Sequence, residues 1–166
     1  ADPFRTGAAD RLFRLKRRPR DLELPVLVAG AAEAAELAEE VPAPARRLMA
    51  RFWPGALTLV LARRAGLNAD LGSDDATIGV RCPAHPVPLA LCRRLGPLAT
   101  TSANLHGQPT PPGGEEVAAL FGGVVLVLDG GTCAGAPSTV VDCTGAEVKL
   151  LREGRIPWAG VVAAVN

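Results

Sequence analysis

Basic side chains gather near the start of the chain, where Lys16 and Arg18 precede Pro19. Lysine offers a compact positive charge and arginine a planar fork of donors, and both suit the oxygens of phosphate groups. Charge alone favours a solvated helix face as the explanation of the basic cluster of residues 11–20. The sequence contains neither a G-x-x-x-x-G-K-[ST] loop nor a G-x-G-x-x-G turn, so no standard nucleotide-binding motif supports a phosphate site.

A run of hydroxyl and amide side chains, Thr100-Thr101-Ser102-Ala103-Asn104, follows a short apolar segment. These side chains donate and accept hydrogen bonds, and loops at strand ends commonly hold ligands. An ordinary turn rich in serine, threonine and asparagine is the alternative.

Arg81 lies within the β pattern of residues 76–82, where an apolar residue would be easier to bury. A buried guanidinium needs a carboxylate or a phosphate as its partner. That partner is either an internal aspartate, such as Asp142, or the carboxylate of a ligand. Ser138 and Arg152 are further polar residues near expected strand ends, and a plain strand end explains either.

Composition argues against several classes of protein. The formal net charge of +1 and the 4% aromatic content, with no tyrosine, argue against a dedicated nucleic-acid binder. No Ser/His/Asp set, carboxylate pair or metal cluster can be assembled, so no residue is assigned as a covalent or general-base catalyst and no metal ligand is named. The four cysteines form no C-x-x-C pair and no apolar run reaches membrane-spanning length, which favours a reduced cytoplasmic setting without a membrane.

Helices and strands alternate along the chain. Apolar residues recur at helical spacing between Thr6, a candidate cap, and Pro19. Further helices are expected at residues 31–40, 43–52, 86–95 and 115–121, with strands at 24–28, 57–61, 76–82, 124–128, 138–142 and 147–151. A loop of turn-forming residues spans 101–114. Because several strands have short connections that parallel crossovers cannot use, we expect a mixed, twisted sheet with helices.

Eight short motifs carry a resemblance to a known family. In chain order they are K-R-R-P, L-P-V-L-V, F-W-P-G-A-L-T-L-V, V-R-C-P-x-H-P, T-S-A-N-L-x-G, D-G-G, P-S-T-V-V-D and L-R-x-G. This ordered set, over about residues 1–156, resembles the YrdC-like family. The resemblance implies a YrdC/RibB-like α/β fold, with an open twisted mixed sheet, helices and a concave basic cavity.

The resemblance also implies a reaction. L-threonine, bicarbonate and ATP give threonylcarbamoyl-AMP and pyrophosphate, with Mg²⁺ accompanying the ATP. A downstream tRNA threonylcarbamoyltransferase then uses the product to make N6-threonylcarbamoyladenosine (t6A) in tRNA, and direct binding of tRNA is a further possible contact. Such a condensation needs positioning and charge stabilisation more than a covalent nucleophile.

Matching positions carry the family's ligand contacts to this chain. The ATP contacts implied by the resemblance are Lys16, Arg18, Thr77, Ser102, Asn104 and Arg152. The threonine contacts implied are Arg81, Thr101 and Ser138, with Arg81 pairing with the carboxylate.

One segment and two positions depart from the family pattern. The family's opening P-T-D-T-V-Y-G-L segment has no counterpart, so we expect residues 1–166 to form a single YrdC-like domain that lacks it. Leu22 replaces a lysine or asparagine, and Leu27 stands where some members have a ligand histidine.

Two other functions remain as alternatives. One is a carbamoyl-adenylate-forming domain of a larger carbamoyltransferase, which would use carbamoyl phosphate. The other is a double-stranded RNA or nucleotide-binding module that relies on the basic cluster, whose affinity would fall steeply with salt.

Overall fold

One mixed sheet organises the chain, whose computed structural model describes residues 1–72, 76–133 and 135–165. Within these residues the strand order is β4-β1-β3-β2-β5-β6. The strands are β1 (Val26–Leu27), β2 (Leu57–Ala62), β3 (Thr77–Arg81), β4 (Leu98–Ala99), β5 (Thr139–Asp142) and β6 (Lys149–Arg152). The pairs β1–β3 and β2–β5 are parallel, while β1–β4, β2–β3 and β5–β6 are antiparallel. The expected mixed sheet is confirmed.

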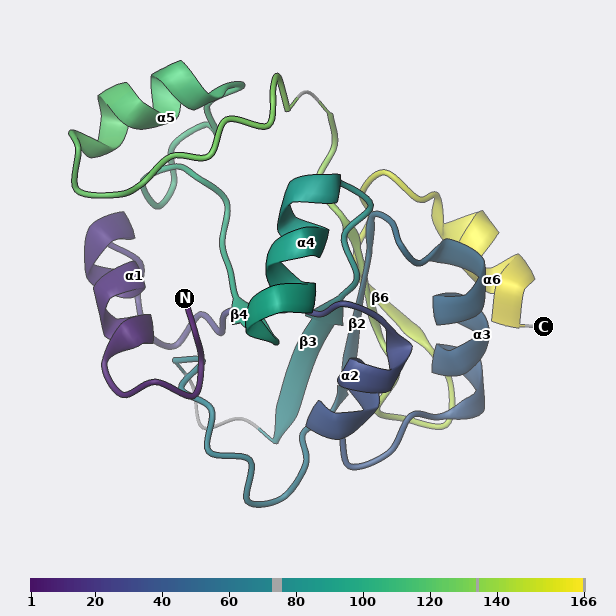
Figure 1. Cartoon of the computed structure of the whole chain (residues 1–166). Helices are drawn as coiled ribbons and strands as arrows, with labels where there is room; N and C mark the ends of the chain where they lie inside the picture. Colours follow the sequence, from purple (N-terminus) through teal and green to yellow (C-terminus); the bar gives the residue numbers. More distant parts are fainter. Residues whose placement is uncertain (73–75, 134, 166) are drawn as a thin grey trace.

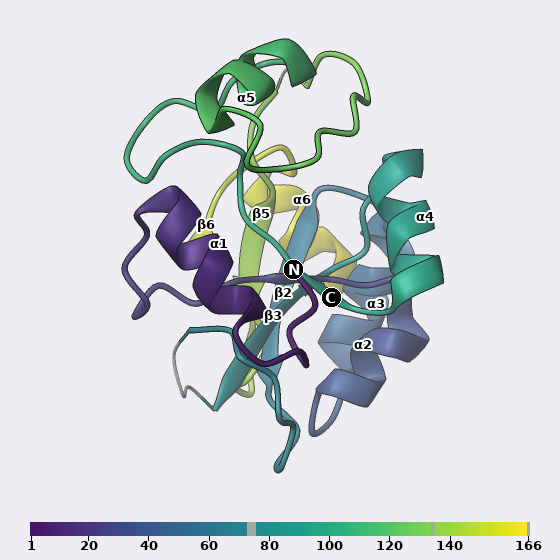
Figure 2. The same cartoon turned by 60° about the vertical axis from the view of Figure 1, so that its left-hand side comes forward.

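Helices accompany the sheet. They are α1 (Ala8–Lys16), α2 (Ala31–Leu37), α3 (Ala43–Phe52), α4 (Pro86–Leu95), α5 (Gly114–Phe121) and α6 (Trp158–Val165). Figure 1 shows α2 and α4 in front of the strands, with α3 and α6 beside them. Turning the molecule brings α2, α3 and α4 together on one side of the sheet, and α1 stands apart from them (Figure 2). None of the helices described is long and apolar enough to cross a membrane.

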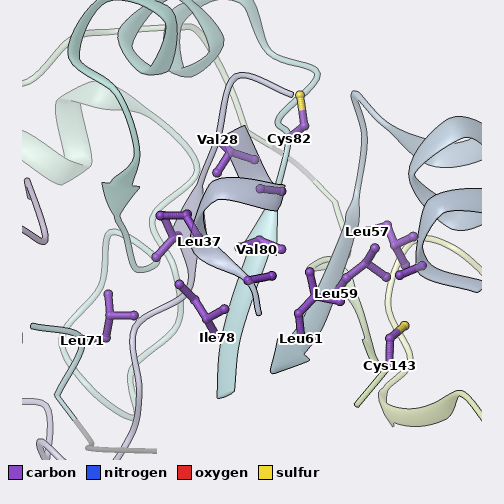
Figure 3. Close-up of a cluster of buried hydrophobic side chains, with 14 of the residues drawn as sticks. Val28, Leu37, Leu57, Leu59, Leu61, Leu71, Ile78, Val80, Cys82 and Cys143 are labelled. Carbon is purple, nitrogen blue, oxygen red and sulfur yellow. The ribbon is translucent and has the colours of Figure 1, made fainter. Parts of the chain in front are cut away.

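The core lies between the sheet and the helices on its covered face. Leu57, Leu59 and Leu61 alternate along β2 and are fully buried, as is Val80 of β3. Leu59 pairs with Val80 on one side and with Val141 of β5 on the other, so these side chains form a continuous apolar row. Figure 3 shows this cluster, with Cys82 and Cys143 at its margins.

Most expected elements are confirmed, with shifted ends. Helix α4 has the expected bounds, because Pro86 suits the first helical turn and Gly96 ends the helix. The expected strand at 24–28 is reduced to the two residues of β1. Thr6 is not the cap of α1, because that position is taken by Gly7, which has a φ of 74°.

In the second half of the chain one expectation was wrong, and one helix had not been expected. Residues 124–128 form no strand, and Leu126 is 87% exposed. Helix α6 was not expected, because its Trp-Ala-Gly-Val-Val-Ala-Ala-Val sequence is apolar all round and lacks an amphipathic pattern. It packs against α3 with Val161 fully buried.

Candidate active site

The sheet has two unlike faces, because side chains alternate along each strand. The leucines of β2 point to the covered face, so Thr58 and Val60 point to the opposite, open face. The antiparallel register of Leu59 with Val80 places Thr58 opposite Arg81 on that open face. Arg152 pairs with Val140, the β5 neighbour of Thr58, and therefore joins the same face.

Arg152, Ser138 and Thr58 form a hydrogen-bonded group. The Arg152 guanidinium donates from Nε and Nη2 to the carbonyl oxygen of Ser138, at 3.2 and 3.0 Å, and from Nη2 to Ser138 Oγ at 3.3 Å. Ser138 Oγ lies 2.9 Å from Thr58 Oγ1, and both hydroxyl residues are buried. Strand β2, the residue before β5, and strand β6 thus bring two hydroxyls and a cation together.

Arg81 stands beside this group without an acidic partner among the residues that the structure describes. Its Nε donates to the carbonyl oxygen of Gly55 at 2.8 Å. Burial, and after it the positive charge of Arg152, lower the pKa of Arg81. Across the described residues the ion pairs are those of Arg20 with Asp10 and Asp70, so neither arginine of the open face is neutralised there.

Asp142 is not the partner of Arg81, although the sequence left that pairing open. Its carboxylate instead accepts hydrogen bonds from the backbone N–H and the hydroxyl of Thr144, at 2.8 and 2.7 Å. Two guanidinium groups with hydroxyls between them, and with no carboxylate in contact in the described part of the chain, make a site for an anion.

Lys16 fastens the polar loop that follows β4. The side chain is buried at 3% exposure, and its ammonium group donates to the carbonyl oxygens of Ser102 and Asn104 and, at 3.3 Å, to Asn104 Oδ1. Asn104 Nδ2 donates in turn to the carbonyls of Leu105 and Gln108, at 2.8 and 2.7 Å. Burial, and after it the charge of Arg18, lower the pKa of Lys16 to about 8.

The remaining expected contacts are more dispersed. Arg18 donates to the carbonyls of Leu22 and Glu23, at 3.0 and 3.1 Å, and burial lowers the pKa of its guanidinium. Thr77 begins β3 on the face that carries Arg81, but it lies four steps along the strand from Arg81, which is about 13 Å. Thr101 is half-buried in the loop after β4.

Of the predicted site residues, the structure therefore joins Lys16 with Ser102 and Asn104, and Arg152 with Ser138. Sequence reasoning missed Thr58. The sequence did contain a sign of it, because Thr58 is a polar residue inside the apolar run L-T-L-V-L. A cavity of about 530 Å³ lies between α2 and α3, and none of these site residues lines it. Arg46 is the single charged residue of its lining.

The family model called Sua5_yciO_yrdC, described as "Telomere recombination", matches residues 1–154. The chain belongs to this Sua5/YciO/YrdC family. A protein of *Mycobacterium tuberculosis* named putative threonylcarbamoyl-AMP synthase is 40% identical over 158 residues, which are 94% of this chain and 73% of that protein. The threonylcarbamoyl-AMP synthase of *Bacillus subtilis* is 38% identical over 170 residues, covering all of this chain and 49% of that protein.

Solved structures agree with the family assignment. The crystal structure of *Pyrococcus abyssi* Sua5 complexed with L-threonine superposes with a TM-score of 0.90 at 35% identity, covering 99% of this chain and 49% of that one. The chain therefore spans about half the length of some relatives. The full-length HypF structure has a TM-score of 0.77 at 19% identity, with 93% of this chain and 21% of that one covered, and at that identity shows only a shared fold.

Proposed function

We propose that this domain catalyses threonylcarbamoyl-AMP synthesis from L-threonine, bicarbonate and ATP. The observation that carries the proposal is the pair Arg81 and Arg152 on the open sheet face, without a carboxylate in contact among the described residues and beside the Ser138 hydroxyl. A threonine carboxylate supplies the missing negative charge at this place. The family's named synthases support the same activity.

In the proposed reaction the threonine amine attacks the carbon of bicarbonate, and loss of water gives the N-carboxylate. An oxygen of that carboxylate attacks the α-phosphorus of ATP, the bond to the bridging oxygen of the β-phosphate breaks, and pyrophosphate leaves. Both steps bring anions together, so fixed positive charge and positioning are the contributions required of the protein.

The residues divide between the two substrates. Arg81 binds the threonine carboxylate, with Thr101 and Ser138 as further threonine contacts. The nucleotide contacts are Lys16, Arg18, Thr77, Ser102, Asn104 and Arg152. Lys16 contributes through its charge and by holding the loop, because its ammonium protons already bond to Ser102 and Asn104.

Mg²⁺ would accompany ATP. The described residues contain no cluster of three or more His, Cys, Asp or Glu side chains that could hold a metal. This fits an ion held mainly by substrate phosphates and water, as Mg²⁺ often is. The ion would offset the charge of the leaving pyrophosphate.

The biological setting belongs to the same proposal. The product would pass to a tRNA threonylcarbamoyltransferase for t6A formation. We expect the reaction in the cytoplasm, where the four free thiols of this chain stay reduced.

Radiolabelled threonine and bicarbonate, incubated with ATP and Mg²⁺, test the activity directly. We expect labelled threonylcarbamoyl-AMP and pyrophosphate in equal amounts, both dependent on threonine. Pyrophosphate release that ignores threonine would contradict the proposal, and product formed only from carbamoyl phosphate would favour a carbamoyl-adenylate-forming domain. Salt-sensitive RNA binding without turnover would favour an RNA-binding module.

A further inference from the structure

Thr58 touches the proposed threonine site without belonging to the contacts assigned above. It lies on the open face near the start of β2, opposite Arg81, and its hydroxyl is 2.9 Å from that of Ser138. Its exposure is 6%, so the hydroxyl has little access to bulk water and needs a protein or ligand partner.

The two branches of the Thr58 side chain have different surroundings. A Cβ added at Gly79 would lie 3.7 Å from Thr58 Cγ2 and equally close to Pro25 Cβ, so the Thr58 methyl faces Gly79. The hydroxyl faces Ser138. Because a β-branched side chain has few χ1 choices, contacts of the methyl fix the direction of the hydroxyl.

Counting protons shows what the pair of hydroxyls offers. A serine hydroxyl has one donor and two acceptor positions. Arg152 Nη2 occupies one acceptor position of Ser138, and the 2.9 Å contact with Thr58 uses one of the two hydroxyl protons. One proton remains for a third partner. When Thr58 donates, both acceptor positions of Ser138 are filled and the Ser138 proton is the one that points outward.

We propose that Thr58 is a positioning residue that turns the Ser138 hydroxyl toward the threonine carboxylate. This inference rests on the proposed function. A carboxylate has only acceptors, so it selects the arrangement in which Thr58 donates to Ser138 and Ser138 donates to the ligand. Arg152 favours the same arrangement by filling the other acceptor position of Ser138. The chain of hydrogen bonds strengthens the outward donor.

The test compares Thr58→Val with Thr58→Ser. Valine keeps the shape and the methyl contact but loses the hydroxyl, whereas serine keeps the hydroxyl. We expect Thr58→Val to raise the KM for threonine about 3- to 10-fold, with less than a twofold change in the KM for ATP. Thr58→Ser keeps the hydroxyl, so its threonine KM should stay within about twofold of the wild-type value. A variant that acted only by destabilising the fold would not show this difference between valine and serine.

A double-mutant cycle separates positioning from packing. In a Ser138→Ala background the further change Thr58→Val should leave the threonine KM unaltered, because no hydroxyl remains to be oriented. Thr144→Val is the matched control, since it also removes one threonine hydroxyl bond, to Asp142, but at the opposite end of β5. Its threonine KM should equal that of the wild type.

The outcomes distinguish the two proposals. If calorimetry and turnover show that the wild-type protein neither binds nor uses threonine, both proposals are overturned. If the wild type is active and Thr58→Val leaves the threonine KM unchanged, or raises it equally in the Ser138→Ala background, only the role of Thr58 is overturned. A Thr58→Val protein that fails to fold shifts the decision to Thr58→Ser, whose threonine KM must then stay near the wild-type value.

Discussion

Arg81 is the residue whose loss should weaken threonine binding most while changing ATP binding least. Its guanidinium is half-buried, bonded through Nε to Gly55 and without an acidic partner among the described residues. A charge-assisted bond to a carboxylate contributes about 1.5 to 3 kcal/mol, so Arg81→Ala should raise the KM for threonine roughly 10- to 150-fold. Steady-state kinetics with each substrate varied in turn measures this effect.

The KM for ATP should change much less in the same Arg81→Ala protein. Arg94→Ala, at an exposed position of α4, provides a control that removes one positive charge away from the open face. Equal increases in both KM values for Arg81→Ala would remove Arg81 from the threonine site.

Lys16 should give ATP binding a dependence on pH. Its pKa is lowered to about 8, so the ammonium form is present below that pH and is lost as the pH rises through it. The positive charge that attracts phosphate therefore disappears above pH 8, and ATP affinity should fall there by at most about tenfold per pH unit. Calorimetric titration between about pH 7 and pH 9.5 follows this change.

Lys16→Met has no proton to lose and should bind ATP weakly with a flat profile over the same range. An identical fall in affinity for wild type and Lys16→Met would assign the titration to another group.

At the scale of the elements, the end of β6 depends on a close approach at Gly154. A Cβ at this position would lie 2.2 Å from the carbonyl oxygen of Pro137 and 2.6 Å from the carbonyl carbon of Ser138. Gly154→Ala must therefore push β6 away from the segment that carries Ser138. Overpacking of this kind costs about 1 to 3 kcal/mol, which urea unfolding should detect as a lower midpoint.

Gly160→Ala is the matched change within helix α6. No atom lies within 4 Å of a Cβ built there, and alanine favours helix over glycine by about 0.5 to 1 kcal/mol. The unfolding free energy of this variant should stay unchanged or increase. A Gly154→Ala protein as stable as Gly160→Ala would show that β6 tolerates displacement.

For the molecule as a whole, ATP binding should stabilise the fold, because a ligand that binds only the folded state raises the free energy of unfolding. The site is also basic: the charge of Arg152 adds to burial in lowering the pKa of Arg81, and the charge of Arg18 adds to burial in lowering the pKa of Lys16. ATP at 100 times its Kd should add about 2.7 kcal/mol to the unfolding free energy. For a chain of this length that is a rise in Tm of roughly 5 to 10 °C.

Arg18→Ala should show a smaller rise in Tm at the same ATP concentration, whatever the Tm of the free variant. Arg94→Ala should show the full rise. A full rise in the Arg18→Ala protein would place Arg18 outside the nucleotide site.

The sequence by itself determined the features that depend on neighbouring residues. The bounds of α4 followed from Pro86 and Gly96, and the alternation of Leu57, Leu59 and Leu61 identified a buried strand. Ordered motifs also identified the family, because motif order is a property of the sequence. The candidate contacts Lys16, Arg81, Ser102, Ser138 and Arg152 came from the same source.

Only the tertiary structure decided which of these residues meet, because strand pairing joins residues that are distant in the chain. The hydroxyls of Thr58 and Ser138 are 80 positions apart, and Lys16 is 88 positions from Asn104. Residues 124–128 have a strand-like composition, yet no described strand pairs with them, so that segment remains exposed. A strand needs hydrogen bonds from a neighbour, and no local pattern supplies that neighbour.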